Sequence, residues 1–168
     1  NFSYFTILTL IILGLSRPRI VDKIKKTSIE VVDMILVLDI SSSMLADDFK
    51  PNRLEAVKKT AIDFVGSRKS DRIGIIVFAG ESFIQCPLTV DKSVLKSLIN
   101  EISIVSKEYD GTAIGMAIAN ATNRLRKSKV KSKVMVLLSD GSNNSGQIDP
   151  KSAAEIASKY DIKIYTIG

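Results

Sequence analysis

The sequence contains no histidine and only one cysteine, and both absences limit the chemistry that it can perform. Without histidine the chain lacks the commonest general base of enzymes, the base of a Ser-His-Asp triad and the usual ligand of zinc. A single cysteine, Cys86, excludes a disulfide bond within the chain, and its place beside Pro87 is typical of a small buried apolar side chain. Any metal ion must therefore be held by oxygen atoms, which favours a hard cation such as Mg²⁺, Mn²⁺ or Ca²⁺.

The remaining composition is that of one ordinary folded domain. The 168 residues are 45% hydrophobic and 25% charged, which is enough for one real core. The net charge of +6 comes from 24 Lys and Arg against 18 Asp and Glu. Such an excess fits a solvated Lys-rich surface or an anionic membrane surface, and we expect no nucleic-acid partner.

The first sixteen residues carry no charge and are strongly apolar from Phe5 to Leu15. As a helix they would reach about 24 Å, which is short of the roughly 30 Å hydrocarbon core of a bilayer. A signal peptide is the rival interpretation, but no basic segment precedes the apolar run and no small-residue cleavage site follows it. We interpret residues 1–16 as a truncated transmembrane helix whose first turn or two precede Asn1.

Two further regions follow this helix. An Arg-Pro-Arg sequence at 17–19 ends it, and residues 17–30 have the composition of a basic juxtamembrane linker. Residues 31–168 form the folded domain. We expect this domain to lack its last elements, because the chain stops at Gly168 directly after a strand-like run.

Strand and helix patterns alternate through the folded domain. Apolar runs typical of buried strands occur at 31–38, 72–79, 133–138 and 162–167. A shorter strand is expected at 82–85, ended by Pro87. Helical spacing of apolar residues begins near Asn52, Asp91, Thr112 and Asp149. This alternation predicts an α/β fold with a mostly parallel sheet and helices on both faces.

Oxygen-bearing side chains follow these elements at places that a parallel sheet brings together. The segments are Asp39-Ile40-Ser41-Ser42-Ser43 after the first strand, Ser139-Asp140-Gly141-Ser142 after the strand at 133–138, and Asp110-Gly111-Thr112 at a helix start. Ligands of open α/β sheets bind at the carboxyl ends of the strands. The sequence therefore predicts one metal site formed by Asp39, Ser41, Ser43, Thr112 and Asp140.

The chemistry of these five side chains suits Mg²⁺ or Mn²⁺. Mg²⁺ takes six oxygen ligands in an octahedron. The hydroxyls of Ser41, Ser43 and Thr112 can coordinate directly, and the two aspartates supply charge directly or through water. Because two carboxylates only balance the ion and hydroxyls are weak ligands, we expect an electrophilic metal with a position open to an acidic side chain of a partner protein.

The same residues resemble the metal-ion-dependent adhesion site (MIDAS) of von Willebrand factor A (VWA) domains. Residues 39–43 match the DxSxS motif, and Thr112 and Asp140 match the other two loops. The resemblance covers about residues 29–168. It implies a doubly wound, Rossmann-like fold with one antiparallel edge strand, and binding through the metal rather than catalysis.

A narrower resemblance is to the bacterial aerotolerance (Bat) membrane proteins, most closely to their BatA group. It rests on the apolar helix that ends in Ser-Arg-Pro and on residues 44–51 (MLADDFKP) and 80–89 (GESFIQCPLT). It implies a protein of the bacterial cytoplasmic membrane that works with sister Bat proteins and a MoxR-type AAA+ ATPase.

Three functions remain open at this point. We favour a membrane-anchored, Mg²⁺-dependent protein-binding module that is not an enzyme. The alternative is a Mg²⁺-dependent phosphatase with Asp39 as nucleophile. Phosphatases of the haloacid dehalogenase type need a second aspartate two residues later as general acid, and that position is Ser41. A structural element that holds no metal is the third interpretation.

The charged residues also predict an orientation. Acids gather in the segments after the strands, whereas basic residues precede the strands, above all between Arg124 and Lys133. We expect the basic end to face the membrane and the metal to point away from it. The positive-inside rule would favour a cytosolic domain, whereas the Bat resemblance favours the periplasm, which we adopt.

Overall fold

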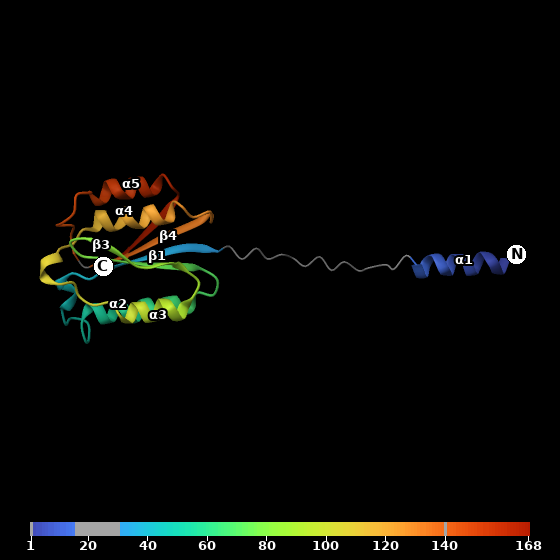
Figure 1. Cartoon of the computed structure of the whole chain (residues 1–168), viewed down its shortest axis with the longest axis horizontal. Coiled ribbons are helices and arrows are strands. Elements are labelled where there is room, and N and C mark those ends of the chain that lie inside the picture. Colours follow the sequence, from blue (N-terminus) through green and yellow to red (C-terminus); the bar gives the residue numbers. More distant parts are fainter. Residues whose placement is uncertain (1, 16–30, 140) are drawn as a thin grey trace.

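The computed structural model describes residues 2–15, 31–139 and 141–168, and within them lies one five-stranded sheet with helices on both faces (Figure 1). The strands are β1 (Val32–Asp39), β2 (Arg72–Phe78), β3 (Ser82–Thr89), β4 (Ser132–Leu138) and β5 (Ile162–Ile167). Their order is β3-β2-β1-β4-β5, and every neighbouring pair is parallel except β2 and β3. This confirms the predicted α/β class with a mostly parallel sheet and one antiparallel edge strand.

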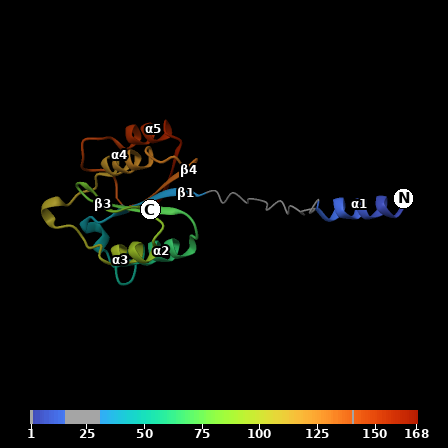
Figure 2. The same cartoon turned by 45° about the vertical axis from the view of Figure 1, so that its right-hand side comes forward.

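Four helices cover the sheet. Helices α2 (Arg53–Ser67) and α3 (Lys92–Asn100) lie on one face, and α4 (Ile114–Leu125) and α5 (Pro150–Ser158) lie on the other (Figures 1 and 2). The caps expected from the sequence are present: the Asn52 side chain accepts a hydrogen bond from the N–H of Glu55, and the Asp149 side chain accepts one from Ser152. Side-chain oxygens at these positions satisfy N–H groups that the first turn leaves free.

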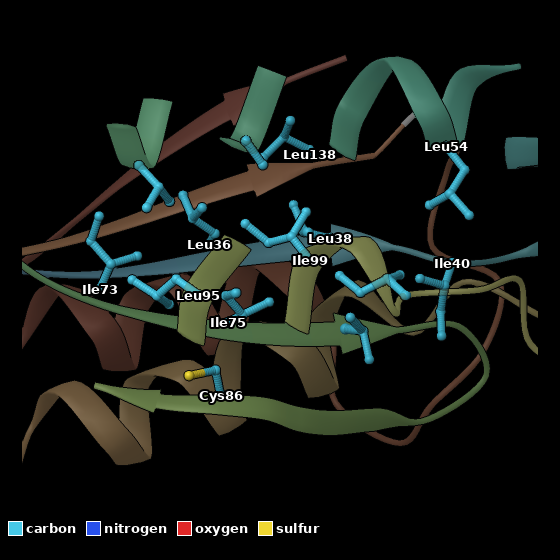
Figure 3. Packing of buried hydrophobic residues seen from close by; sticks show 14 of the residues in the cluster. Leu36, Leu38, Ile40, Leu54, Ile73, Ile75, Cys86, Leu95, Ile99 and Leu138 are labelled. Atoms are coloured by element: carbon cyan, nitrogen blue, oxygen red, sulfur yellow. The ribbon is translucent and has the colours of Figure 1, made fainter. Parts of the chain in front are cut away.

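The core lies on both faces of the central strand β1. Leu36 and Leu38 point toward α2 and α3, where they pack with Ile75 and Ile99 (Figure 3). Ile35 belongs to the second core, beneath α4 and α5. Successive side chains of a strand point to opposite faces, so a strand covered on both sides must be apolar throughout. The position of β1 thus explains its nearly continuous apolar sequence.

Strand β3 is longer than the sequence predicted. It continues through Cys86 and Pro87 to Thr89, with Cys86 opposite Ile75 on β2. The prediction that Pro87 ends the strand was wrong because proline is tolerated on an edge strand with an irregular register, where its missing N–H breaks no regular ladder. Cys86 is buried, as expected, and this burial raises the pKa of its thiol.

A charged pair inside the sheet was not foreseen. Asp33 on β1 has no exposed surface, and its carboxylate accepts hydrogen bonds from the guanidinium of Arg72 on β2. This hydrogen bonding raises the pKa of Arg72 above its ordinary value. The two residues are register partners, so the pair ties the amino ends of both strands together.

The predicted N-terminal helix is present as α1 (Phe2–Leu15). Its 14 residues extend about 21 Å. In the part of the chain that the structure describes, no helix is both long and apolar enough to cross a membrane. The assignment of residues 1–16 to a transmembrane helix stays a prediction, and residues 16–30, which hold the predicted linker, lie outside the described residues.

Candidate metal centre

The first loop of the predicted site follows β1 at the carboxyl edge of the sheet. Asp39 is fully buried, and its Oδ1 accepts a hydrogen bond from the backbone N–H of Ser41 at 2.9 Å. Ser41 begins a tight turn that continues as a short 3-10 helix, η1 (Ser42–Leu45). This turn brings the hydroxyl oxygens of Ser41 and Ser43 within 2.9 Å of each other. The spacing in DxSxS therefore places the two hydroxyls side by side in a turn whose backbone is bonded to the Asp39 carboxylate.

The second loop runs from a short 3-10 helix, η2 (Lys107–Tyr109), to the start of α4. Two backbone hydrogen bonds anchor it on the end of β2: Gly80 N–H to Tyr109 O at 3.0 Å, and Ala113 N–H to Ala79 O at 2.7 Å. Thr112, which lies between these anchors, is 5% exposed. Helix α4 begins at Ile114, two residues later than predicted, because Thr112 and Ala113 belong to this loop.

The third loop follows β4, and its predicted ligand, Asp140, lies outside the described residues. Its neighbours are described on both sides. The hydroxyl of Ser139 donates to Asp39 Oδ2 at 2.7 Å. A Cβ on Gly141 would lie 3.4 Å from the Thr112 hydroxyl oxygen. Ser139 therefore contacts the first loop, and Gly141 lies close to the second.

A further residue, Asp110, joins the first two loops directly. Its Oδ1 accepts the backbone N–H of Ser42 at 2.9 Å, and its Oδ2 accepts the Ser42 hydroxyl at 2.5 Å. The backbone N–H of Gly111 donates to the same carboxylate. The hydrogen bond from the Ser42 hydroxyl, followed by those from the two N–H groups, lowers the pKa of Asp110 below its usual value. Asp110 thus carries a negative charge at the rim of the site and clamps the Ser41–Ser43 turn against the Thr112 loop.

The oxygen atoms in this region fit a small hard cation. Ligand oxygens at neighbouring corners of an octahedron with bonds of 2.0–2.1 Å lie about 2.9 Å apart. The Ser41 and Ser43 hydroxyls have this separation. Among residues 2–15, 31–139 and 141–168, no three acidic or cysteine side chains group closely enough to hold a metal by themselves. A metal held by the described residues alone would therefore depend on the hydroxyls.

The position of Asp39 does not favour the phosphatase alternative. A nucleophilic carboxylate must reach a substrate phosphorus atom. Asp39 is fully buried and both of its oxygens already accept hydrogen bonds, one from Ser41 and one from Ser139. This environment suits a residue that holds loops in place and balances the charge of a cation.

Sequence reasoning missed the side chains that fasten the loops together. Besides Ser139 and Asp110, these include Asn144. Its side-chain Oδ1 accepts the backbone N–H of Thr112 at 2.8 Å, and its backbone N–H donates to the Thr112 carbonyl oxygen. The only signal was their position within the polar segments that follow β4 and precede α4. Polar residues in such turns are too common to be assigned a partner before the fold is known.

Comparison with known proteins gives a family for this domain. The family model described as von Willebrand factor type A domain matches residues 33–168. An uncharacterized protein of Borreliella burgdorferi is 35% identical over 137 residues, which are 81% of this chain and 40% of that protein. The chain thus spans less than half the length of the curated relatives that it matches first.

Three solved structures are also similar. BatB from Bacteroides thetaiotaomicron is 37% identical with a TM-score of 0.74, over 82% of this chain and 66% of that one. An aerotolerance-related membrane protein from Bacteroides fragilis is 36% identical with a TM-score of 0.74, over 82% and 67%. Proximal thread matrix protein 1 from the mussel byssus, described with a zinc-occupied MIDAS motif, is 27% identical with a TM-score of 0.72, over 82% and 35%.

Proposed function

This chain belongs to the von Willebrand factor type A domain family, and on that premise we propose that it is a Mg²⁺-dependent or Mn²⁺-dependent protein-binding module. The ligands that we propose are Asp39, Ser41, Ser43, Thr112 and Asp140. The observation that carries the proposal is the 2.9 Å approach of the Ser41 and Ser43 hydroxyls beside the buried Asp39 carboxylate. The zinc-occupied MIDAS motif of the byssus protein supports a divalent ion in a site of this family.

The role of the chain's own residues follows from their contacts. Asp39 would balance part of the ion's charge, and its hydrogen bonds to Ser41 and Ser139 would keep the first and third loops in place. The serine hydroxyls are neutral, weak ligands, so the two carboxylates would only balance the charge of the ion and the metal would stay electrophilic. A bound Mg²⁺ would supply an electrophilic position that attracts an acidic side chain of a partner protein.

We further propose a setting for this binding. The similar structures include BatB and a protein described as an aerotolerance-related membrane protein. On this likeness, the chain would act at the bacterial cytoplasmic membrane, anchored by residues 1–16, with its domain in the periplasm. Its partners would be sister Bat proteins and a MoxR-type AAA+ ATPase.

Capture of partners from detergent-solubilised membranes tests the proposal. The chain would be immobilised and exposed to membrane extract in Mg²⁺ or in EDTA, and the retained proteins identified by mass spectrometry. We expect a set of proteins that is retained only in Mg²⁺ and is lost with Ser41→Ala/Ser43→Ala.

The matched control is Ser67→Ala/Ser158→Ala, which removes two exposed serine hydroxyls at the ends of α2 and α5. This variant should retain the same proteins as the wild type. An identical set of proteins in Mg²⁺ and EDTA, or equal retention by the two double variants, would overturn the proposal.

A further inference from the structure

The turn that connects α4 to β4 is strongly basic. Residues 124–133, with the sequence RLRKSKVKSK, contain six Lys and Arg and no acidic residue. We call this segment the basic turn. Arg124, Arg126, Lys127, Lys129 and Lys131 are all exposed. The net charge of the whole chain is +6, and the six basic residues of the basic turn carry the same amount of positive charge.

The basic turn lies at the amino edge of the sheet, opposite the candidate metal centre. Ser132 pairs with Val32, the first residue of β1, and Lys133 pairs with Ile162, the first residue of β5. The metal loops instead follow Asp39 and Leu138, at the other ends of β1 and β4. Figure 1 shows the tip of the α4–β4 connection beside the start of β1. The end of the domain where the chain enters β1 is therefore the end that carries the basic turn.

Among the described residues no acidic partner neutralises the charges of the basic turn, and the guanidinium of Arg126 donates only to the neutral side-chain oxygen of Asn123. Elsewhere on this edge, Arg72 is paired with Asp33 and Arg68 lies 3.9 Å from Asp71. By contrast, no described acidic side chain forms a salt bridge with a lysine of the basic turn. Like charges crowded into ten residues repel one another, and an anionic surface relieves this repulsion.

We propose that the basic turn docks the domain on the anionic lipid headgroups of a bilayer. The continuity of the chain favours a bilayer as the occupant: β1 begins at this edge, and the sequence before it carries five more basic residues at 17–26 and the apolar helix α1. Clusters of Lys and Arg beside an apolar anchor bind anionic lipid through long-range attraction that salt weakens. Docking through this edge would leave the opposite, metal-bearing edge facing away from the bilayer. The proposal does not depend on a metal or on a protein partner.

Vesicle co-sedimentation of the full chain tests the proposal. Vesicles of phosphatidylcholine alone would be compared with vesicles that contain phosphatidylglycerol, at low and at high salt. Because α1 can associate with both kinds of vesicle, the informative quantity is the ratio of anionic to neutral binding. We expect Lys127→Glu/Lys129→Glu/Lys131→Glu to lower this ratio by at least about tenfold, since each basic residue near such a surface contributes substantially to binding.

The matched control is Lys50→Glu/Lys107→Glu/Lys151→Glu, which makes the same change in net charge with exposed lysines at the opposite end of the domain. Its ratio should stay within about twofold of the wild type, because charges there lie beyond the reach of screened attraction. Circular dichroism would check that both variants are folded. Equal losses in the two variants, no loss in either, or a requirement for Mg²⁺ would overturn the proposal, as would binding of soluble heparin without binding of anionic vesicles. Vesicle binding should be unchanged by EDTA. A failure of vesicle binding can therefore be distinguished from a failure of metal-dependent protein binding.

Discussion

The carboxylate of Asp110 accepts hydrogen bonds from both the backbone N–H and the hydroxyl of Ser42, a residue 68 positions earlier in the chain. This contact holds the Ser41–Ser43 turn beside the loop of Thr112. We predict that Asp110→Ala lowers the affinity for Mg²⁺ by about 10-fold to 100-fold, because residues that orient metal ligands have effects of this size. Calorimetric titration of Mg²⁺ measures it. Glu108→Ala, an exposed carboxylate two residues away, is the control; equal affinities in the two variants would contradict the role of Asp110.

Gly115 on α4 leaves room for the loop before α5. A Cβ at this position would overlap the carbonyl oxygen of Ile148, which is backbone and cannot swing away. We expect Gly115→Ala to destabilise the domain by about 1–3 kcal/mol, as overpacked positions do. Gly66→Ala on α2 is the matched control, because its Cβ would make only an ordinary 3.6 Å contact with Lys96. The control should stabilise the fold by up to about 1 kcal/mol. Urea unfolding measures both, and a loss of the same size in both would refute the packing argument.

The pair of Asp33 and Arg72 gives a third prediction. Arg72→Ala would leave the fully buried Asp33 carboxylate without its guanidinium partner. Since the Arg72 side chain is itself 39% exposed, the loss should lie below the 3–5 kcal/mol typical of a fully buried pair, at about 2–3 kcal/mol. Arg53→Ala, which breaks the more exposed pair with Asp48, should cost clearly less in the same unfolding experiment. The reverse order would show that burial does not set the strength of these pairs.

Asp91, the N-cap of α3, predicts a dependence of stability on pH. The hydrogen bond from the Ser93 hydroxyl, together with the N–H groups of Val94 and Ser93, lowers the pKa of Asp91. Because its pKa is lowered on folding, the ionised Asp91 carboxylate stabilises the fold above the unfolded pKa of about 3.9. This stabilisation is lost as the pH falls through the pKa of the folded state. Asp91→Asn keeps a capping oxygen but never carries the charge. The melting temperature of the wild type should exceed that of Asp91→Asn at pH 6, and the difference should shrink below pH 4. A difference that persists unchanged at pH 2 would contradict this assignment.

The sequence predicted the features that depend on local chemistry. Asn52 and Asp149 cap helices because their oxygens reach N–H groups only three residues away, so a short segment contains all of the information. The order of strand and helix likewise followed from patterns of apolar residues. The DxSxS spacing predicted the approach of Ser41 and Ser43 for the same reason, since one turn of backbone joins them.

Contacts between distant segments could not be predicted in this way. The hydrogen bonds from Ser139 to Asp39 and from Ser42 to Asp110 join residues 100 and 68 positions apart. Nothing in either short segment specifies its partner, because many serines could make the same bond. The role of Asp33 could not be predicted for a related reason. A carboxylate in a buried strand needs a partner, and this partner, Arg72, is its neighbour only in the folded sheet.

Titration calorimetry with Mg²⁺ measures whether the Ser41 and Ser43 hydroxyls help to hold a metal ion. The wild-type chain and Ser67→Ala/Ser158→Ala should bind Mg²⁺ at a single site with similar affinity. Ser41→Ala/Ser43→Ala should lose this binding while its melting temperature without metal stays close to that of the control, since the two hydroxyls bond to each other and are removed together. Unchanged Mg²⁺ binding in the folded Ser41→Ala/Ser43→Ala variant would contradict the assignment of these hydroxyls as metal ligands.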